Sequence, residues 1–398
     1  MTRHYTTRDL FRQMPHHLLA LYFAGQAECD ALAAATVANV KTAELFELWL
    51  QLPDSRRNSM DSEFRDMFEL SSAKGFRAIL DEAEYHFTHD HGGLAAFALK
   101  LGALANHFER AMVTYLDHSA FWKGAGLLNH ADSLPYWRKR KNFPHKAAAV
   151  DEDSLNTLAQ QIGSYFHRND GRGKNCVVEP FKRGELDYFF AYPEDYSQQS
   201  VEWVNGAFDR RPHNPAFEIV FVYSQKEGSL DLNVRGAPKA IEPLQGMFAT
   251  VILKLDALPP NAKDKRVYDL APLSKKSFEF LPAAGSGIGK VVVKKIRLSS
   301  RVKKGDRITV EADTIKDADA VNQLVLEIAK SIPLHQYSVT QIELTASVVD
   351  GDKPPRDVTF TVTHPNSCSL KYDPVHMKLR EMLEASGIEL KEPSEHMA

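Results

Sequence analysis

The sequence predicts a multidomain α+β protein: an N-terminal α-helical bundle followed by two α+β units with mainly antiparallel sheets. The chain has 398 residues, more than one ordinary core needs. Its 43% hydrophobic and 25% charged residues are typical of globular proteins. The spacing of apolar residues changes after Pro144 from three or four to two. We therefore expect an α-helical domain at 1–149, an α+β domain with an antiparallel sheet at 150–257, a linker at 258–287, and an α+β domain with a cationic strand at 288–398.

The first region carries the apolar spacing of helices. Its clearest segment has apolar residues every three or four positions, on one helical stripe: Leu94, Phe97, Leu101, Leu104, Phe108, Met112 and Tyr115. Similar spacing predicts helices at 15–23, 28–50 and 74–89, with Pro53 and Gly92-Gly93 as stop signals. We expect these helices to form a bundle.

Strands dominate the predicted middle unit. After a short helix from Asp151, we expect strands at 176–181, 187–192, 217–223 and 230–234, and then a helix at 239–253. In the last strand Asp231 and Asn233 alternate with leucines, so this strand should expose one polar face. The strand from Asp187 to Tyr192 is apolar on both faces, which favours burial over an exposed aromatic platform.

A proline-containing connection, 258–276, precedes the third predicted unit. Beyond it the pattern predicts strands at 290–299 and 307–312, a helix at 318–330, strands at 337–349 and 356–363, and a helix at 374–386. This order is typical of an α+β unit with an antiparallel sheet.

A run of basic residues, 290–307, is the strongest functional signal; we call it the cationic segment. It contains one acid, Asp306, and eight basic residues: Lys290, Lys294, Lys295, Arg297, Arg301, Lys303, Lys304 and Arg307. The chain as a whole has a net charge of −3. Lys295, Arg297, Arg301 and Lys303 alternate with apolar or small residues, which predicts a cationic stripe on one strand face. Because like charges along a strand repel, the stripe predicts a polyanion or an acidic partner opposite it.

Two further basic clusters are candidate contacts for nucleic acid. Arg138, Lys139, Arg140 and Lys141 lie among aromatic residues, an arrangement that suits a nucleic-acid strand. A solvated linker from the helical domain explains this cluster equally well. Arg172 and Lys174 belong to a glycine-containing loop that could approach an anion, although an ordinary surface turn is the favoured interpretation.

His86, His89 and Asp90 form the densest group of potential metal ligands. On a helix their spacing would place all three on one face. The cluster lies at a predicted helix end, where histidine is favourable through the helix dipole, and we favour that interpretation. The three cysteines include no Cys-x-x-Cys pair, which argues against disulfides and structural zinc. Gly285 to Lys290 resembles a phosphate loop, but Lys290 is followed by valine and a predicted strand.

We therefore expect a noncatalytic nucleic-acid-binding subunit of a cytoplasmic complex, in bacterial genome maintenance or antiphage defence, a setting that no residue supports. A scaffold that docks an acidic protein is one alternative, and a metal-dependent hydrolase or nuclease built on His86, His89 and Asp90 is another. A sequence pI of about 6.6 counts against a dedicated DNA binder. We expect no cofactor and no membrane association, since no apolar run is long enough for a membrane helix. A protein partner or a homo-oligomer is compatible with the sequence.

Overall fold

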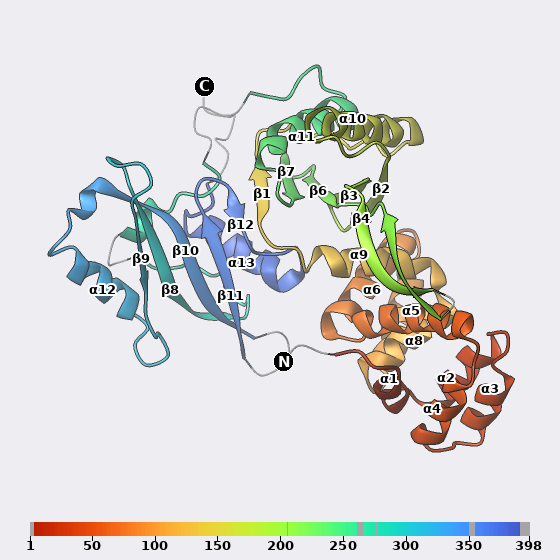
Figure 1. Ribbon diagram of the computed structural model, residues 1–398. Helices are drawn as coiled ribbons and strands as arrows, with labels where there is room; N and C mark the ends of the chain where they lie inside the picture. Colours follow the sequence, from red (N-terminus) through yellow and green to blue (C-terminus); the bar gives the residue numbers. More distant parts are fainter. Residues whose placement is uncertain (1–3, 205, 261–265, 275–277, 350–354, 391–398) are drawn as a thin grey trace. The chain divides into compact units, whose positions relative to one another are not determined.

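The computed structural model describes residues 4–204, 206–260, 266–274, 278–349 and 355–390 (Figure 1). Internal contacts divide the chain into two compact units. The first is residues 1–133 with 181–184, and the second is residues 134–180 with 185–398. Helices fill the N-terminal region and a large antiparallel sheet follows it, which confirms the predicted α+β class. Within the described ranges, no helix is both long enough and apolar enough to span a bilayer.

The first unit is a set of helices joined by short turns (Figure 1). They are α1 (Thr7–Gln13), α2 (His16–Ala24), α3 (Asp30–Val37), α4 (Thr42–Leu50), α5 (Asp54–Leu70), α6 (Ala73–His86), α7 (His91–Gly102), α8 (His107–Asp117) and α9 (Trp122–Ala131). Phe11 lies at the centre of their core, with its ring edge-on to Phe23, Trp49 and Phe64. Such aromatic pairs add to the stability that burial alone gives.

Two predicted long helices are each broken in the structure. The apolar stripe from Leu94 to Tyr115 is divided between α7 and α8, because the Asn106 side chain accepts hydrogen bonds from the backbone N–H groups of Phe108 and Glu109. This N-cap starts a new helix and satisfies donors that a helix leaves unpaired. The predicted helix at 28–50 is likewise divided into α3 and α4. The apolar spacing continues across the first break because Phe97, Leu101 and Met112 belong to one core.

The second unit is built on one ten-stranded sheet, ordered β2-β3-β6-β7-β1-β12-β11-β10-β8-β9. Its strands are β1 (Trp137–Arg140), β2 (Cys176–Arg183), β3 (Leu186–Pro193), β6 (Ile219–Ser224), β7 (Ser229–Val234), β8 (Ile288–Ser300), β9 (Arg307–Glu311), β10 (Tyr337–Val348), β11 (Arg356–Thr363) and β12 (Ser367–Cys368). Both predicted α+β segments therefore contribute to a single sheet. Whether 150–257 and 288–398 fold separately stays a prediction.

Helices cover the sheet over two separate cores. The core beside β3, β6 and β7 includes residues of α10 (Glu152–Asp170), α11 (Ile241–Met247) and a π-helical turn at Phe248–Ile252. The core beside β8, β10 and β11 includes residues of α12 (Ala320–Ile328) and α13 (Pro374–Ala385). Each half of the sheet therefore buries an apolar face against helices of its own.

Strand β1 corrects the interpretation of residues 136–146 as a solvated linker. Its residues pair with β7 on one side, where Lys139 lies opposite Asp231, and with β12 on the other, where Trp137 lies opposite Cys368. Trp137 is fully buried, and Lys139 is only 5% exposed. Four consecutive residues that begin with a tryptophan thus form an interior strand. A strand with neighbours on both sides buries its side chains whatever their charge, and the charges must then be paired.

Acidic residues from distant segments pair with these buried lysines. The Lys139 ammonium lies 2.8 Å from Glu227 Oε2, in the turn between β6 and β7, and 3.0 Å from Glu389 Oε1. Lys141 Nζ lies 3.2 Å from the same Glu389 oxygen. Burial would raise the pKa of Glu389, but Lys139 and Lys141 lower it below its ordinary value. Both carboxylates are therefore held in the ionised form that the lysines require.

The buried charges also correct the expectation for β7. Asp231 is 3% exposed and Asn233 is 5% exposed, so this strand has no solvated face. Asn233 donates a hydrogen bond from Nδ2 to the carbonyl oxygen of Pro135, just before β1. Burial raises the pKa of Asp231, and Lys139 and Arg380 oppose that effect. By contrast, the predicted burial of both faces of β3 is confirmed, since Tyr188, Phe189, Phe190 and Ala191 are fully buried.

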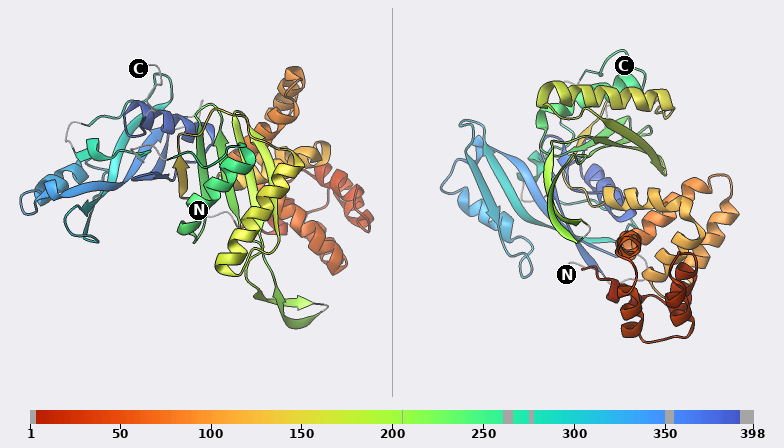
Figure 2. Two further views of the ribbon diagram at one scale, coloured as in Figure 1. Left: turned by 90° about the horizontal axis from the view of Figure 1, so that it is seen from above. Right: turned by 45° about the vertical axis from the view of Figure 1, so that its right-hand side comes forward.

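The structure contains a two-stranded ribbon that the sequence pattern did not predict. Strands β4 (Gln198–Val204) and β5 (Ala207–His213) pair only with each other and project from the sheet (Figure 2). Trp203 is 73% exposed and its ring meets the edge of Phe208, which is 54% exposed. An isolated two-stranded ribbon buries little surface. Large apolar side chains that stay exposed to solvent on such a ribbon are uncommon.

We predict that Glu389→Gln lowers the free energy of unfolding by about 3 kcal/mol or more, because it leaves the buried Lys139 without one of its two carboxylates. Urea unfolding followed by tryptophan fluorescence measures this loss, since Trp137 lies next to the cluster in β1. The matched control is Glu311→Gln, which removes a surface carboxylate 2.9 Å from Lys295 and should cost less than about 1 kcal/mol. Equal losses in the two variants would show that the buried ion pairs are not what holds β1.

Candidate anion-binding site

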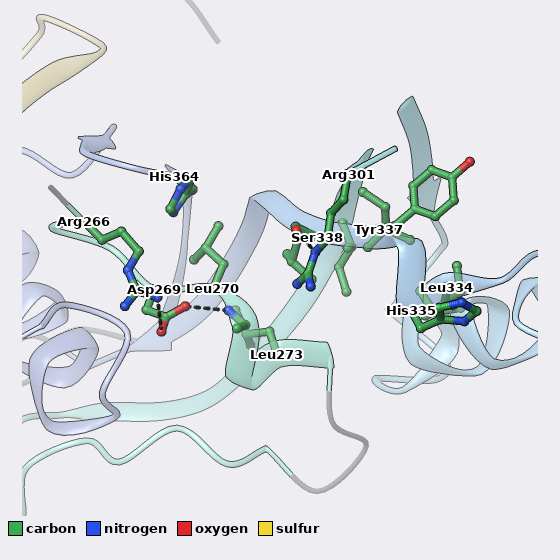
Figure 3. A pocket seen from close by; sticks show the side chains of 15 residues that line it. Arg266, Asp269, Leu270, Leu273, Arg301, Leu334, His335, Tyr337, Ser338 and His364 are labelled. Atoms are coloured by element: carbon green, nitrogen blue, oxygen red, sulfur yellow. Dashed lines mark hydrogen bonds and ion pairs between the residues drawn. The ribbon is translucent and has the colours of Figure 1, made fainter. Parts of the chain in front are cut away.

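A cavity of about 400 Å³ lies against the C-terminal half of the sheet (Figure 3). Its walls come from β8, β10, α12 and the segment from Arg266 to Leu273, which ends in a 3-10 turn at Ala271–Ser274. A second 3-10 turn, Leu334–Gln336, closes one end, and His364 lies at the other side (Figure 3). The cavity has the size of common small-molecule sites.

Apolar side chains form most of this cavity. They come from both strands, the helix and both turns: Leu270, Leu273, Ile296, Leu298, Val325, Leu334 and Val339. Ile296 and Leu298 lie two apart on β8, so they point to the same side of the sheet. Both are buried, as is Val339 on β10. The alternating pattern of β8 therefore supplies the apolar floor.

Arg301 contributes a positive charge to the cavity. It follows the last residue of β8, and its Nε donates a hydrogen bond to Ser338 Oγ over 2.6 Å. Figure 3 shows the two side chains next to each other. Among the described residues, no carboxylate lies within ion-pair distance of Arg301. The serine therefore orients the guanidinium group without neutralising it.

His364 lines the same cavity in a defined tautomer. Its Nδ1 lies 3.1 Å from the carbonyl oxygen of Tyr268. Because a carbonyl oxygen can only accept a hydrogen bond, Nδ1 carries the proton. Nε2 then accepts a hydrogen bond in the neutral ring and donates one in the protonated ring.

The one carboxylate at the cavity wall is already engaged. Asp269 accepts a hydrogen bond on Oδ1 from the backbone N–H of Ala271, 3.0 Å away. Its Oδ2 lies 3.1 Å from Arg266 Nη1. Asp269 thus balances Arg266, and the charge of Arg301 remains in excess among the residues that line the cavity. An apolar cavity with excess positive charge suits an anion carried on an apolar body.

The basic residues of the cationic segment have different surroundings in the structure. Lys295 lies 2.9 Å from Glu311 and 3.8 Å from Glu343, on the two neighbouring strands. The hydrogen bond that Lys295 donates to Glu311, and then the charge of Glu343, raise the pKa of Lys295. Lys303 lies in the turn after β8, 3.4 Å from Asp306. These two lysines are therefore partly neutralised, which their spacing in the sequence did not indicate.

Arg297 remains a strong candidate for anion binding. It pairs across the strands with Thr309, and Ser299 pairs with Arg307, so Arg297 and Arg307 are diagonal neighbours on one face. Burial, and then the charge of Arg307, lower the pKa of Arg297. Its Nε is buried and has no hydrogen-bond partner among the described residues. An incoming anion would relieve both the repulsion and the missing hydrogen bond.

The basic cluster on β1 is not a surface cluster. Lys139 and Arg140 are buried, and Arg140 donates hydrogen bonds to Gln245 Oε1 and to the carbonyl oxygen of Pro259. Lys141 bonds to Glu389 and to the carbonyl oxygen of Leu390. Arg138 is half-buried. Because Lys139, Arg140 and Lys141 are occupied inside the fold, we do not include this cluster in the proposed interface.

The loop after α10 is also held by internal contacts. Arg172 lies 2.9 Å from Asp195 and 3.4 Å from Asp170, and its guanidinium carbon lies 4.0 Å from the ring centre of Phe217. Its side chain is only 15% exposed. Lys174 is exposed. The hydrogen bond from Asn214, then those from Asn175, and last the charge of Lys174 lower the pKa of Glu194. The structure therefore gives Arg172 a structural role that the loop sequence did not predict.

The histidine cluster lies where α6 ends and α7 begins. Asp90 is the N-cap of α7 and accepts a hydrogen bond from the backbone N–H of Gly93. His86 Nε2 lies 3.3 Å from Glu82 Oε1, while His89 is exposed. In the described part of the chain, no group of three or more histidine, cysteine, aspartate or glutamate side chains is arranged to hold a metal.

Glu82 itself is an unusual buried acid. It is 4% exposed, on α6 where that helix packs against Gly124 of α9. A side chain at position 124 would collide with the Glu82 carboxyl group, so the glycine makes room for it. Burial raises the pKa of Glu82 from 4.5 to about 7.

Sequence reasoning identified Arg301 but missed its neighbours in the cavity. Ser338 belongs to β10, His364 follows β11, and Leu270 precedes a turn. None of them lies in a motif, and only the folded sheet brings them together. A scan against protein-family models and a search of curated proteins found no match for this chain, so the functional argument rests on its geometry.

We predict that stability falls as pH rises from about 4.5 to above 7, in part through Glu82. A carboxyl group whose pKa is raised in the folded protein binds its proton more tightly there than in the unfolded chain, so deprotonation favours unfolding. Glu82→Gln should reduce the change in the free energy of unfolding over this pH range by up to about 3 kcal/mol. Thermal unfolding midpoints at several pH values test it, with Glu84→Gln, exposed on the same helix, as the matched control. A pH profile that Glu82→Gln leaves unchanged would contradict the prediction.

Proposed function

We propose that this protein is a noncatalytic polyanion-binding subunit and that its ligand is nucleic acid. One observation carries the proposal. Of the eight basic residues in the cationic segment, only Lys295 and Lys303 have a carboxylate within ion-pair distance among the described residues. The other six are Lys290, Lys294, Arg297, Arg301, Lys304 and Arg307. Unpaired cations that are close together bind phosphates by releasing condensed counterions.

The arrangement of these cations supports a long ligand. They lie along β8, in the turn that follows it, and at the start of β9, which is the last strand of the sheet. Lys304, in the turn, and Arg307, at the start of β9, are exposed, and Arg297 on β8 is half-buried. A row of this kind can follow a phosphate backbone, whereas its residues offer few groups that would distinguish bases. We therefore expect binding that depends on salt and little on sequence.

We further propose that the protein works in the cytoplasm as part of a complex. The three cysteines support a reducing compartment, because Cys29, Cys176 and Cys368 are all free. The exposed ribbon of β4 and β5 supports a partner, since Val201, Trp203 and Phe208 leave apolar surface in contact with water.

We predict that Lys304→Glu with Arg307→Glu weakens oligonucleotide binding at least about tenfold at low salt and reduces the salt dependence by about two phosphate contacts. Both side chains are exposed, so the fold should be unaffected. Fluorescence anisotropy with single- and double-stranded oligonucleotides at two salt concentrations measures the effect. The control is Lys41→Glu with Lys74→Glu, which changes the net charge equally at two exposed residues, one at the N-cap of α4 and one in the first turn of α6. If the control weakens binding as much, or if the wild type does not bind at low salt, the proposal fails.

A further inference from the structure

We infer that the cavity beside Arg301 binds a small organic anion, a carboxylate or phosphate carried on an apolar body. This inference goes beyond the proposed function, since the cavity ligand is a small molecule and not the nucleic-acid backbone. The two share Arg301 but rest on different observations. The first rests on unpaired cations along β8, the turn after it and β9, and the second on a partly open cavity with mainly apolar side chains and an oriented guanidinium group.

The apolar side chains of the cavity determine which kind of group can form the body of the ligand. Leucine, isoleucine and valine side chains from β8, β10, α12 and both turns surround about 400 Å³. Water gains few hydrogen bonds from such walls, so an apolar group that replaces it is favoured. A phosphate backbone, which must remain hydrated, would not fill this space. The ligand therefore needs an aliphatic or aromatic part that can leave water.

The excess charge sets the head group. Asp269 is matched by Arg266, over 3.1 Å, so Arg301 provides the net positive charge of the lining. Its Nε donates a hydrogen bond to Ser338 Oγ, and this contact fixes the direction of the guanidinium group. In the described ranges, neither terminal nitrogen of Arg301 has a recorded hydrogen bond, so both can donate to the two oxygens of one carboxylate or phosphate.

His364 supplies a second polar contact. Its Nδ1–H is fixed on Tyr268, so Nε2 is the ring atom available to a ligand. In the neutral ring Nε2 accepts a hydrogen bond from a ligand hydroxyl, including that of a protonated phosphate. In the protonated ring it donates one to an oxygen anion. A cavity with an oriented arginine and an imidazole in a mainly apolar wall is more selective for an amphiphilic anion than for a neutral apolar compound.

The test uses 8-anilinonaphthalene-1-sulfonate, an aromatic anion that becomes fluorescent when it leaves water. We expect the full-length protein to bind it, and Arg301→Gln to weaken binding at least tenfold. Val325→Trp, which fills the cavity from α12, should abolish binding and leaves every cation in place. The matched control Arg307→Gln removes an exposed arginine from β9 and should bind as the wild type does. Trp203→Ser accounts for probe bound to the exposed ribbon.

Displacement by compounds of equal chain length identifies the head group. Octanoate and octyl phosphate should displace the probe, with the stronger competitor naming the preferred anion, whereas octanol should displace it poorly. The inference is overturned if Arg301→Gln and Val325→Trp both bind the probe normally, or if octanol competes as well as octanoate. Lys304→Glu with Arg307→Glu should leave probe binding unchanged, so failure of either proposal can be seen without the other.

Discussion

The burial of Lys139 in the middle of the sheet is the constraint on which the second unit depends. An unpaired ammonium group in an apolar interior costs several kcal/mol, so β1 can occupy its place only if carboxylates accompany it. Glu227 and Glu389 do so from later in the sequence, 88 and 250 residues away. The two halves of the sheet, each with its own apolar core, are thus joined by a strand whose charges must be matched. The cavity beside β8 exists because β8 to β12 continue this sheet.

Much of the fold could be predicted because most strands obey one local rule. β8, β10 and β11 alternate apolar and polar residues over part or most of their length, and their observed bounds lie within a few residues of the predicted ones. β1 follows no such rule, since Trp137 is followed by three basic residues that are typical of solvated segments. Its burial depends on acids elsewhere in the chain, which no local pattern reveals. The ribbon of β4 and β5 was missed for the opposite reason: its apolar residues are exposed, so they pack against no core.

The same distinction between local pattern and long-range contacts applies to the candidate site. The charge of Arg297 and its place on β8 could be predicted from the sequence, and so could the charge of Arg301, which follows that strand. The neutralisation of Lys295 could not, since Glu311 and Glu343 reach it from two other strands. Ser338 and His364 likewise join Arg301 only through strand register and turns. Sequence alone therefore indicates where cations lie, while the fold determines which of them are still free to bind a ligand.

The central position of β1 has a consequence for synthesis of the chain. β1 is synthesised well before β12, its neighbour on one side, and Lys139 is synthesised 250 residues before Glu389. Until then Trp137 has an open strand edge, and Lys139 lacks one of its two carboxylates. Contacts over such long separations form slowly, and open edges invite pairing with other chains. The nascent protein should therefore rely on holding chaperones until release, and a chain that stops short of residue 389 should aggregate.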